Sequence, residues 1–173
     1  MKVNDRMVWI ELATSGPDPE ADHITRISTV VTDKELGVLG DGSALPVEDT
    51  AAAQAAILEV VKKHVLKGAG LLAGTRVQEV RLFLAAHLPE LFEYLHYRNI
   101  DVSTLRELVR RWYPDVYADR PQGDGTIEGA IAELRYYRGS VFATPEKVIE
   151  RAAAAAAKAA SAAAETTPAS ENG

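Results

Sequence analysis

Three short apolar segments near the start of the chain are typical of β-strands. Residues 7–12 are mostly apolar and partly β-branched, and residues 24–32 place isoleucine and valine among threonines. Residues 36–39 predict a third strand, with a hairpin turn at Asp33-Lys34 before it and Gly40-Asp41-Gly42 ending it. The segment between the first two strands, 14–19, is rich in turn formers. Three strands in succession predict an antiparallel meander.

From residue 49 onward the spacing of apolar positions becomes helical. The pattern predicts helices over 50–66, 77–88, 89–95, 103–112 and 127–138. Asp49 or Thr50 is the expected cap of the first helix, and Ser103 that of the fourth. Short apolar stretches predict strands at 71–73 and 99–102, and 115–125 predicts a loop. The order of elements predicts an α/β protein in which a mixed sheet is flanked by helices.

The character of the chain changes at Pro145. Residues 151–164 are almost entirely alanine, which favours helix but buries little surface. We therefore predict a globular domain over residues 1–144 and a helical or disordered tail over residues 145–173.

Composition excludes several classes of protein. The 173 residues are 47% hydrophobic and 25% charged, as in ordinary globular proteins, and they include no cysteine, which rules out disulfides, zinc ribbons and cysteine nucleophiles. The net charge of −6 argues against a protein that coats long nucleic acid. Residues 1–6 have no apolar segment of the kind that signal peptides carry, and no apolar stretch has transmembrane length. We expect a cytoplasmic protein without a membrane partner.

Three segments together resemble the oligoribonuclease family of the DEDD exonuclease superfamily. Residues 95–114 read LHYRNIDVSTLRELVRRWYP, close to the family's H-Y-R-x-x-D-V-S-T-x-K-E-L-A-R-R-W stretch, and 131–138 read IAELRYYR, like its last helix. Residues 8–33 are similar to its first hairpin. The resemblance covers about 5–142 and implies an RNase H-like fold and dimeric 3′→5′ exoribonuclease activity on short RNA. In the family, four acidic residues hold two Mg²⁺ or Mn²⁺ ions and a histidine is the general base.

The acidic motifs of that family are largely replaced in this chain. Its D-x-E-x-T-G motif corresponds to residues 11–16, ELATSG, which substitutes Glu11 for the aspartate and Ala13 for the glutamate. Its second motif corresponds to 74–84, where Val80 occupies the aspartate position. Glu79 is adjacent, but one residue turns a helix by about 100°, so we expect Glu79 to point elsewhere. In the third motif, Thr126 and Pro121 stand for the aspartate and the histidine.

Magnesium and manganese require hard oxygen ligands, and Glu11 alone cannot hold two ions. We therefore expect that no metal cofactor binds. The family also has an additional strand and helix after its third strand, whereas here residues 45–48 lead almost directly into the next helix. The fold is thus predicted to be shortened after the third strand, with part of the wall that would hold the RNA missing.

Other residues of the family's site are retained. Tyr97 matches a tyrosine that reaches the neighbouring subunit's active site, and it is the remaining catalytic candidate beside Glu11. Thr14, His96 and Arg98 are the candidates for binding a nucleotide. The alternative is that residues 96–98 build a dimer interface, where aromatic residues and arginine are favoured.

Two further features are open to a structural interpretation. Arg106 and Arg110 share a helix face and either meet phosphate or form ion pairs with residues such as Glu107. Trp9 and Trp112 lie in apolar patterns that predict core or interface positions.

Three hypotheses follow for the function. The leading one is an inactive oligoribonuclease homologue that acts as a homodimer and binds short oligoribonucleotides, nucleotides or another partner. The second is an active exoribonuclease whose metal site is rebuilt from Glu11, Glu79, Asp124 and Glu128. The third is a structural remnant without a ligand.

Overall fold

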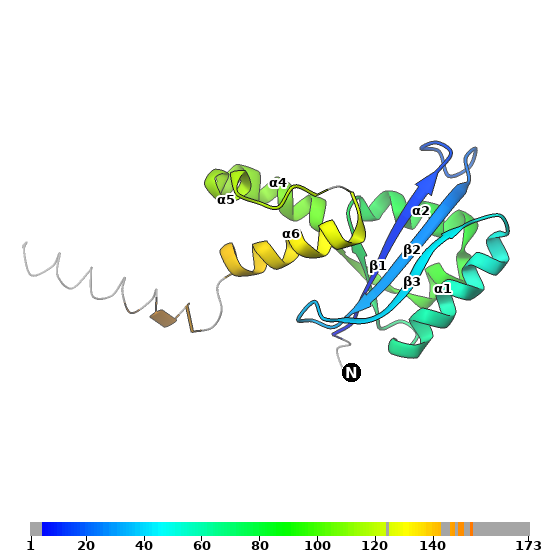
Figure 1. The fold of residues 1–173 in the computed structure, drawn as a ribbon, viewed down its shortest axis with the longest axis horizontal. Helices are drawn as coiled ribbons and strands as arrows, with labels where there is room; N and C mark the ends of the chain where they lie inside the picture. Colours follow the sequence, from blue (N-terminus) through cyan, green and yellow to red (C-terminus); the bar gives the residue numbers. More distant parts are fainter. Residues whose placement is uncertain (1–4, 124, 143–145, 148, 151–152, 154–173) are drawn as a thin grey trace, which may run out of the picture. The chain divides into compact units, whose positions relative to one another are not determined.

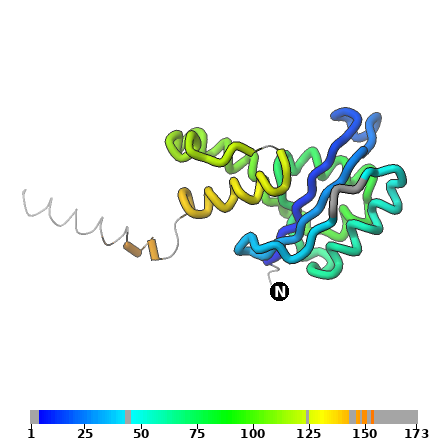
Figure 2. Tube along the Cα trace, in the orientation of Figure 1, coloured from blue at the N-terminus to red at the C-terminus, as the bar shows by residue number. Residues whose placement is uncertain are grey.

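The predicted meander forms the N-terminal part of the sheet (Figures 1 and 2). The computed structural model describes residues 5–123, 125–142, 146–147, 149–150 and 153, with the backbone alone at 43–45. β1 (Met7–Thr14) pairs antiparallel with β2 (Ile24–Thr32), and β2 pairs antiparallel with β3 (Val38–Pro46). The alternation of apolar residues in the first two strands therefore predicted the hairpin correctly.

The third strand is longer than predicted and begins later. Gly40 and Gly42, expected to end it, pair with Val31 and Thr29 of β2. A Cβ atom at Gly40 would lie 2.5 Å from His64 Nε2, and one at Gly42 would lie 2.8 Å from Thr29 Cγ2. Glycine at these positions permits close packing on the strand rather than a turn. Only residues 47–49 separate β3 from the next helix, as predicted.

Two parallel strands complete the five-stranded sheet, whose order is β3-β2-β1-β4-β5. β4 (Leu71–Gly74) pairs parallel with β1, and β5 (His96–Asp101) pairs parallel with β4. The prediction of a strand over 99–102 was wrong at both ends. The strand begins at His96, and Val102, which is completely buried, is already the first residue of a helix.

Between residues 50 and 140 the described chain forms six helices: α1 (Thr50–His64), α2 (Val77–His87), α3 (Pro89–Tyr94), α4 (Val102–Trp112), α5 (Pro114–Ala118) and α6 (Ile127–Ser140). The cap of α1 is Asp49, whose carboxylate accepts from the N–H groups of Ala51 and Ala52. The expected cap Ser103 is incorrect, because Asp101 caps α4 and accepts from the Ser103 N–H at 2.8 Å. The predicted loop 115–125 is wrong for residues 115–118, because these belong to α5, which begins at Pro114, a residue favoured at the first position of a helix.

The alternation of β1 divides the core between the two faces of the sheet. Val8 and Ile10 pack in a cluster with residues of α1, α2 and α3, whereas Met7 and Trp9 pack with Ile127 and other residues at the start of α6. Trp9 is completely buried and donates from Nε1 to Thr32 Oγ1 at 2.9 Å. The prediction of a core position is confirmed for this tryptophan. The start of α6 therefore packs on one face of β1, and α1, α2 and α3 pack on the opposite face of the sheet.

The chain divides into two compact units, residues 1–136 and 137–173. The site described next lies entirely in the first unit. The predicted domain boundary between residues 144 and 145 falls outside the described residues, as does the predicted alanine helix apart from Ala153. None of the helices in the described part of the chain has both the length and the apolar character needed to traverse a lipid bilayer.

Candidate functional site

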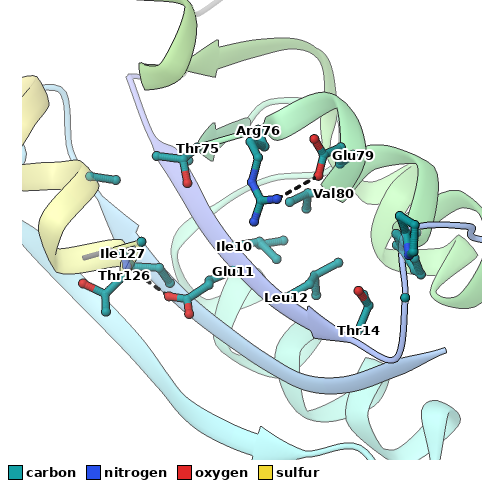
Figure 3. Close-up of a pocket in the computed structure, with 16 residues that line it drawn as sticks. Ile10, Glu11, Leu12, Thr14, Thr75, Arg76, Glu79, Val80, Thr126 and Ile127 are labelled. Carbon is teal, nitrogen blue, oxygen red and sulfur yellow. Dashed lines mark hydrogen bonds and ion pairs between the residues drawn. The ribbon is translucent and has the colours of Figure 1, made fainter. Parts of the chain in front are cut away.

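A cavity of about 310 Å³ lies where the ends of β1 and β4 meet the starts of α2 and α6 (Figure 3). These two strands are parallel, so their carboxyl ends lie at the same edge of the sheet, where α/β proteins bind ligands. The wall is formed by the end of β1, the loop after it, the β4–α2 connection and the first turn of α6. Glu11 and Thr14, both predicted from sequence, line it.

Glu11 is engaged in capping α6. Its Oε2 atom accepts from the Ile127 N–H at 3.1 Å, across 116 residues of sequence. The N-terminus of a helix carries a partial positive charge and unpaired N–H groups, so a carboxylate is stabilised there. Thr126 completes this cap, because its hydroxyl accepts from the Gly129 N–H at 3.1 Å. Two residues that the resemblance predicts at metal-binding positions thus have hydrogen bonds of a structural kind.

The other residues that the resemblance predicts at the acidic motifs carry no carboxylate or imidazole that could bind a metal ion. Ala13 is exposed, and its side chain lies on the same face of β1 as Glu11. Val80 is buried in the apolar cluster under the pocket. Pro121 is exposed, and Asp124 lies outside the described residues. Among the residues that the structure describes, no three carboxylates or histidines gather in a way that could hold a metal ion.

Glu79 differs from the prediction that it would point elsewhere. It lines the same pocket as Glu11, because it lies near the start of α2, whose first turn borders the cavity (Figure 3). Its Oε2 atom forms an ion pair with Arg76 Nη1 at 3.3 Å. The two glutamates therefore share one pocket, and each already has a partner.

Arg76 is the pocket residue that sequence reasoning missed. In the sequence, the segment GTR at 74–76 opens the stretch that resembles the family's second acidic motif, whose aspartate position is Val80. Arg76 has a φ of 52°, in the left-handed region that an arginine rarely adopts. Its N–H donates to Ser103 Oγ at 3.0 Å, which ties the start of α2 to α4. The signal that the sequence offers for this pocket residue is an arginine placed between a buried strand and the helix that follows it.

The loop after β1 is held by a network around Asp22. The Asp22 carboxylate accepts from the Ser15 hydroxyl at 2.8 Å and from the Asp18 N–H at 3.0 Å. The hydrogen bond from the Asp18 backbone N–H and then that from the Ser15 hydroxyl lower the pKa of Asp22. At its far side, His87 Nε2 lies 3.0 Å from the Pro19 carbonyl oxygen. The loop that contributes Gly16 and Pro17 to the pocket wall is thus anchored at both ends.

His96, Tyr97 and Arg98 form a separate group on β5 and do not line the pocket. The rings of His96 and Tyr97 stack at 4.4 Å, the Arg98 guanidinium lies 5.6 Å from the Tyr97 ring centre, and His96 Nδ1 accepts from the Arg98 N–H. Arg81 of α2 donates to Asn99 Oδ1 at 2.6 Å and to the His96 carbonyl, and burial lowers its pKa. Within the described chain, the structure does not bring these three residues to Glu11 and Thr14.

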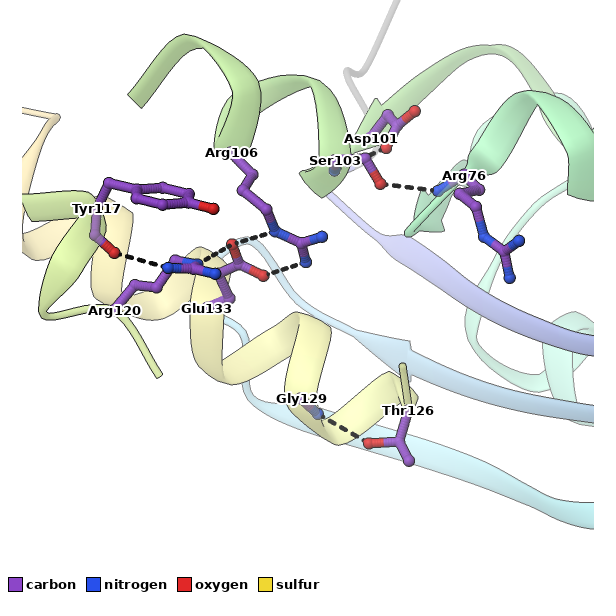
Figure 4. Close-up of polar contacts among 9 residues, drawn as sticks. All are labelled: Arg76, Asp101, Ser103, Arg106, Tyr117, Arg120, Thr126, Gly129 and Glu133. Carbon is purple, nitrogen blue, oxygen red and sulfur yellow. Dashed lines mark hydrogen bonds and ion pairs between the residues drawn. The ribbon is translucent and has the colours of Figure 1, made fainter. Parts of the chain in front are cut away.

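The arginines of α4 form ion pairs. Arg110 and Arg111 both contact Glu107, which lowers the pKa of Glu107 and raises that of Arg110. The ion-paired interpretation is therefore confirmed for Arg110. Arg106 differs, because it forms a bidentate contact with Glu133 of α6 (Figure 4). The side chain of Trp112 is 67% exposed, so of its two predicted positions the core is wrong and the interface stays a prediction.

Comparison with solved structures identifies the class of fold. An exonuclease I from Methylocaldum szegediense has a TM-score of 0.57 at 19% identity over 79% of this chain. Exonuclease I of E. coli in complex with a 5cy-dT13 oligonucleotide has a TM-score of 0.58 at 15% identity over 80% of this chain. The chain spans 41% of the length of each. The fold is that of the RNase H-like exonucleases, as the sequence predicted.

No family model matches the chain. Comparison with individual sequences nevertheless identifies its family within the exonucleases. The oligoribonuclease of Shewanella loihica is 37% identical and is covered over 95% of its length by 79% of this chain. That of Vibrio parahaemolyticus is 36% identical, with 97% and 80% covered respectively. The chain belongs to the oligoribonuclease family.

Proposed function

We propose that this member of the oligoribonuclease family binds short oligoribonucleotides or nucleotides and does not hydrolyse them with metal ions. The observation that carries the proposal is the hydrogen bond from Ile127 to Glu11, because Glu11, which stands in place of the first motif's aspartate, caps a helix. Two-metal hydrolysis requires several carboxylates free to coordinate both ions. Val80 and Thr126 supply none, and Arg76 brings a positive charge into the same pocket.

The test is a hydrolysis assay on an end-labelled diribonucleotide with Mg²⁺ or Mn²⁺. We expect no shortening above a no-enzyme control, while calorimetric titration detects binding of the dinucleotide. The Glu11→Ala variant distinguishes true activity from a contaminating nuclease. Manganese-dependent shortening by the unchanged protein that this variant loses would refute the proposal.

We further propose that the protein is a homodimer through residues 96–114. Tyr97 is 74% exposed and Trp112 is 67% exposed, and large exposed aromatic residues are favoured in interfaces. A twofold interface would use this one patch on both subunits. Sedimentation at micromolar concentration is expected to show a dimer that Trp112→Ala weakens. A monomeric unchanged protein would contradict this part of the proposal.

A second candidate function is hydrolysis by a rearranged metal site. It is favoured by the position of Glu79, which lines one pocket with Glu11. Glu128 is exposed on the first turn of α6, and Asp124 is outside the described residues. The manganese assay decides between the candidates, because the rearranged site requires activity that both Glu11→Ala and Glu79→Ala abolish.

A further inference from the structure

We infer that Arg76 binds the phosphate of a nucleotide in this pocket directly, without a divalent cation. The inference rests on the proposed function and names the group that performs the binding. Among the described residues that line the cavity, Arg76 is the one positively charged side chain. It extends from the start of α2 beside Val80 (Figure 3). In a pocket whose acidic motifs are replaced, a guanidinium supplies the positive charge that phosphate requires.

The backbone of Arg76 is fixed while its side chain is accessible. The N–H donates to Ser103 Oγ, and Ser103 is held in turn by Asp101 at the start of α4 (Figure 4). The left-handed conformation of Arg76 is costly for a residue with a side chain, and such conformations concentrate at ligand sites. The side chain itself is 73% exposed. The guanidinium of Arg76 is therefore accessible to a ligand.

The present partner of Arg76 is one that a phosphate can displace. The ion pair with Glu79 has an N–O distance of 3.3 Å, and Glu79 is 64% exposed. Exposed ion pairs contribute little free energy because water screens them. A phosphate offers more charge and several acceptor oxygens to the same guanidinium. Glu79 thus acts as a competitor, and its removal should strengthen binding.

The rest of the cavity suits a single nucleotide. Its volume of about 310 Å³ is at the lower end of the usual range for small-molecule sites, about 300–1,000 Å³. Ile10, Leu12, Val80 and Phe83 supply an apolar wall against which a base or ribose can pack. The chemistry therefore favours a nucleoside monophosphate or the terminal nucleotide of a short RNA.

The experiment is calorimetry in EDTA with four probes: a nucleoside 5′-monophosphate, its nucleoside, inorganic phosphate and a diribonucleotide. We expect the monophosphate to bind at least about tenfold more tightly than the nucleoside or inorganic phosphate alone. Arg76→Asn keeps a residue that tolerates the left-handed conformation, and should raise the Kd of the monophosphate about tenfold. Arg76→Lys should retain part of the affinity.

A second variant, whose effect on the Kd should have the opposite sign, provides the sharper test. Glu79→Gln should lower the Kd a few-fold, opposite in sign to Arg76→Asn. Lys63→Asn and Glu59→Gln are matched controls, because they alter an exposed ion pair of 3.0 Å on α1 that does not line the pocket. They should leave the Kd unchanged, and circular dichroism confirms that each variant is folded.

The possible results distinguish the role of Arg76, the specificity for a nucleotide and the proposed binding function. If the diribonucleotide binds in EDTA but Arg76→Asn and Glu79→Gln do not change its affinity, the role of Arg76 is refuted and the proposed binding function stands. If inorganic phosphate binds as tightly as the monophosphate, the nucleotide specificity is refuted. If RNA binds only with Mn²⁺ and is then shortened, both this inference and the proposed function are refuted.

Discussion

Substitution of Glu133 should cost the first unit several kcal/mol of stability, about as much as breaking a buried ion pair. Its side chain is 1% exposed, and its carboxylate accepts from Arg106 Nε at 2.8 Å and from Arg106 Nη2 at 2.6 Å (Figure 4). Arg120 approaches the same carboxylate at 4.0 Å, and its guanidinium lies 3.8 Å from the ring centre of Tyr117. One buried carboxylate on α6 thus contacts both α4, through Arg106, and the segment that follows α5, through Arg120.

Replacement of Glu133 by glutamine removes the charge and retains the shape. The amide has one acceptor oxygen for two guanidinium groups, and its NH₂ group faces an N–H donor. Breaking one partner of a buried ion pair costs about 3–5 kcal/mol. Arg106 is 33% exposed, so water compensates part of this loss, and we expect about 3 kcal/mol. For a domain of this size that corresponds to a fall in Tm of roughly 10 °C.

The assay is denaturant unfolding followed by far-ultraviolet circular dichroism, with the free energy extrapolated to water. Glu107→Gln is the matched control, since it removes the same charge from a carboxylate that also contacts two arginines but is exposed. We expect this control to change stability little. The double variant Arg106→Met, Glu133→Gln should lose less than the sum of its single variants, because the two residues interact.

A loss for Glu133→Gln no greater than that for Glu107→Gln would refute the reasoning. It would mean that solvent reaches the Arg106–Glu133 pair as readily as it reaches the pairs on the outer face of α4. Strict additivity in the double variant would refute the direct coupling between the two side chains in the same way.

Three further predictions concern other parts of the chain. Thr32→Val should cost about 1–3 kcal/mol in denaturant unfolding, because the buried Trp9 N–H loses its acceptor; unchanged stability would contradict this. The pKa of Asp22 is lowered in the fold, so its stabilisation is present above its ordinary value of 3.8 and is lost as the pH falls through the lower folded value. Asp22→Asn should therefore flatten the stability profile in that acidic range, and an unaltered profile would exclude the effect. Removal of residues 151–173 should leave Tm nearly unchanged, since alanine buries little area, whereas a drop of many degrees would show that the segment packs.

The local pattern of apolar and polar residues was sufficient to predict those elements in which apolar side chains alternate between buried and exposed positions. The alternation in residues 7–12 and 24–32 determined the β1–β2 hairpin and the two faces of the sheet. It was insufficient where backbone pairing alone defines an element, as in β3, because Gly40 and Gly42 form ladder bonds without a characteristic side chain. Similarly, the cap of α4 depended on which of two neighbouring polar residues accepts the N–H group.

The sequence by itself pointed to the family, and the resemblance predicts that residues such as Ala13 and Val80 stand in its acidic motifs. What those motifs have become was decided only by the tertiary structure. Glu11 meets the start of α6 across 116 residues, and Glu133 is buried against Arg106. Arg76 lines the pocket, and its backbone N–H donates to Ser103, 27 residues further along the chain. Such pairings depend on the packing of distant helices, and a polar residue has no local pattern that identifies its eventual partner.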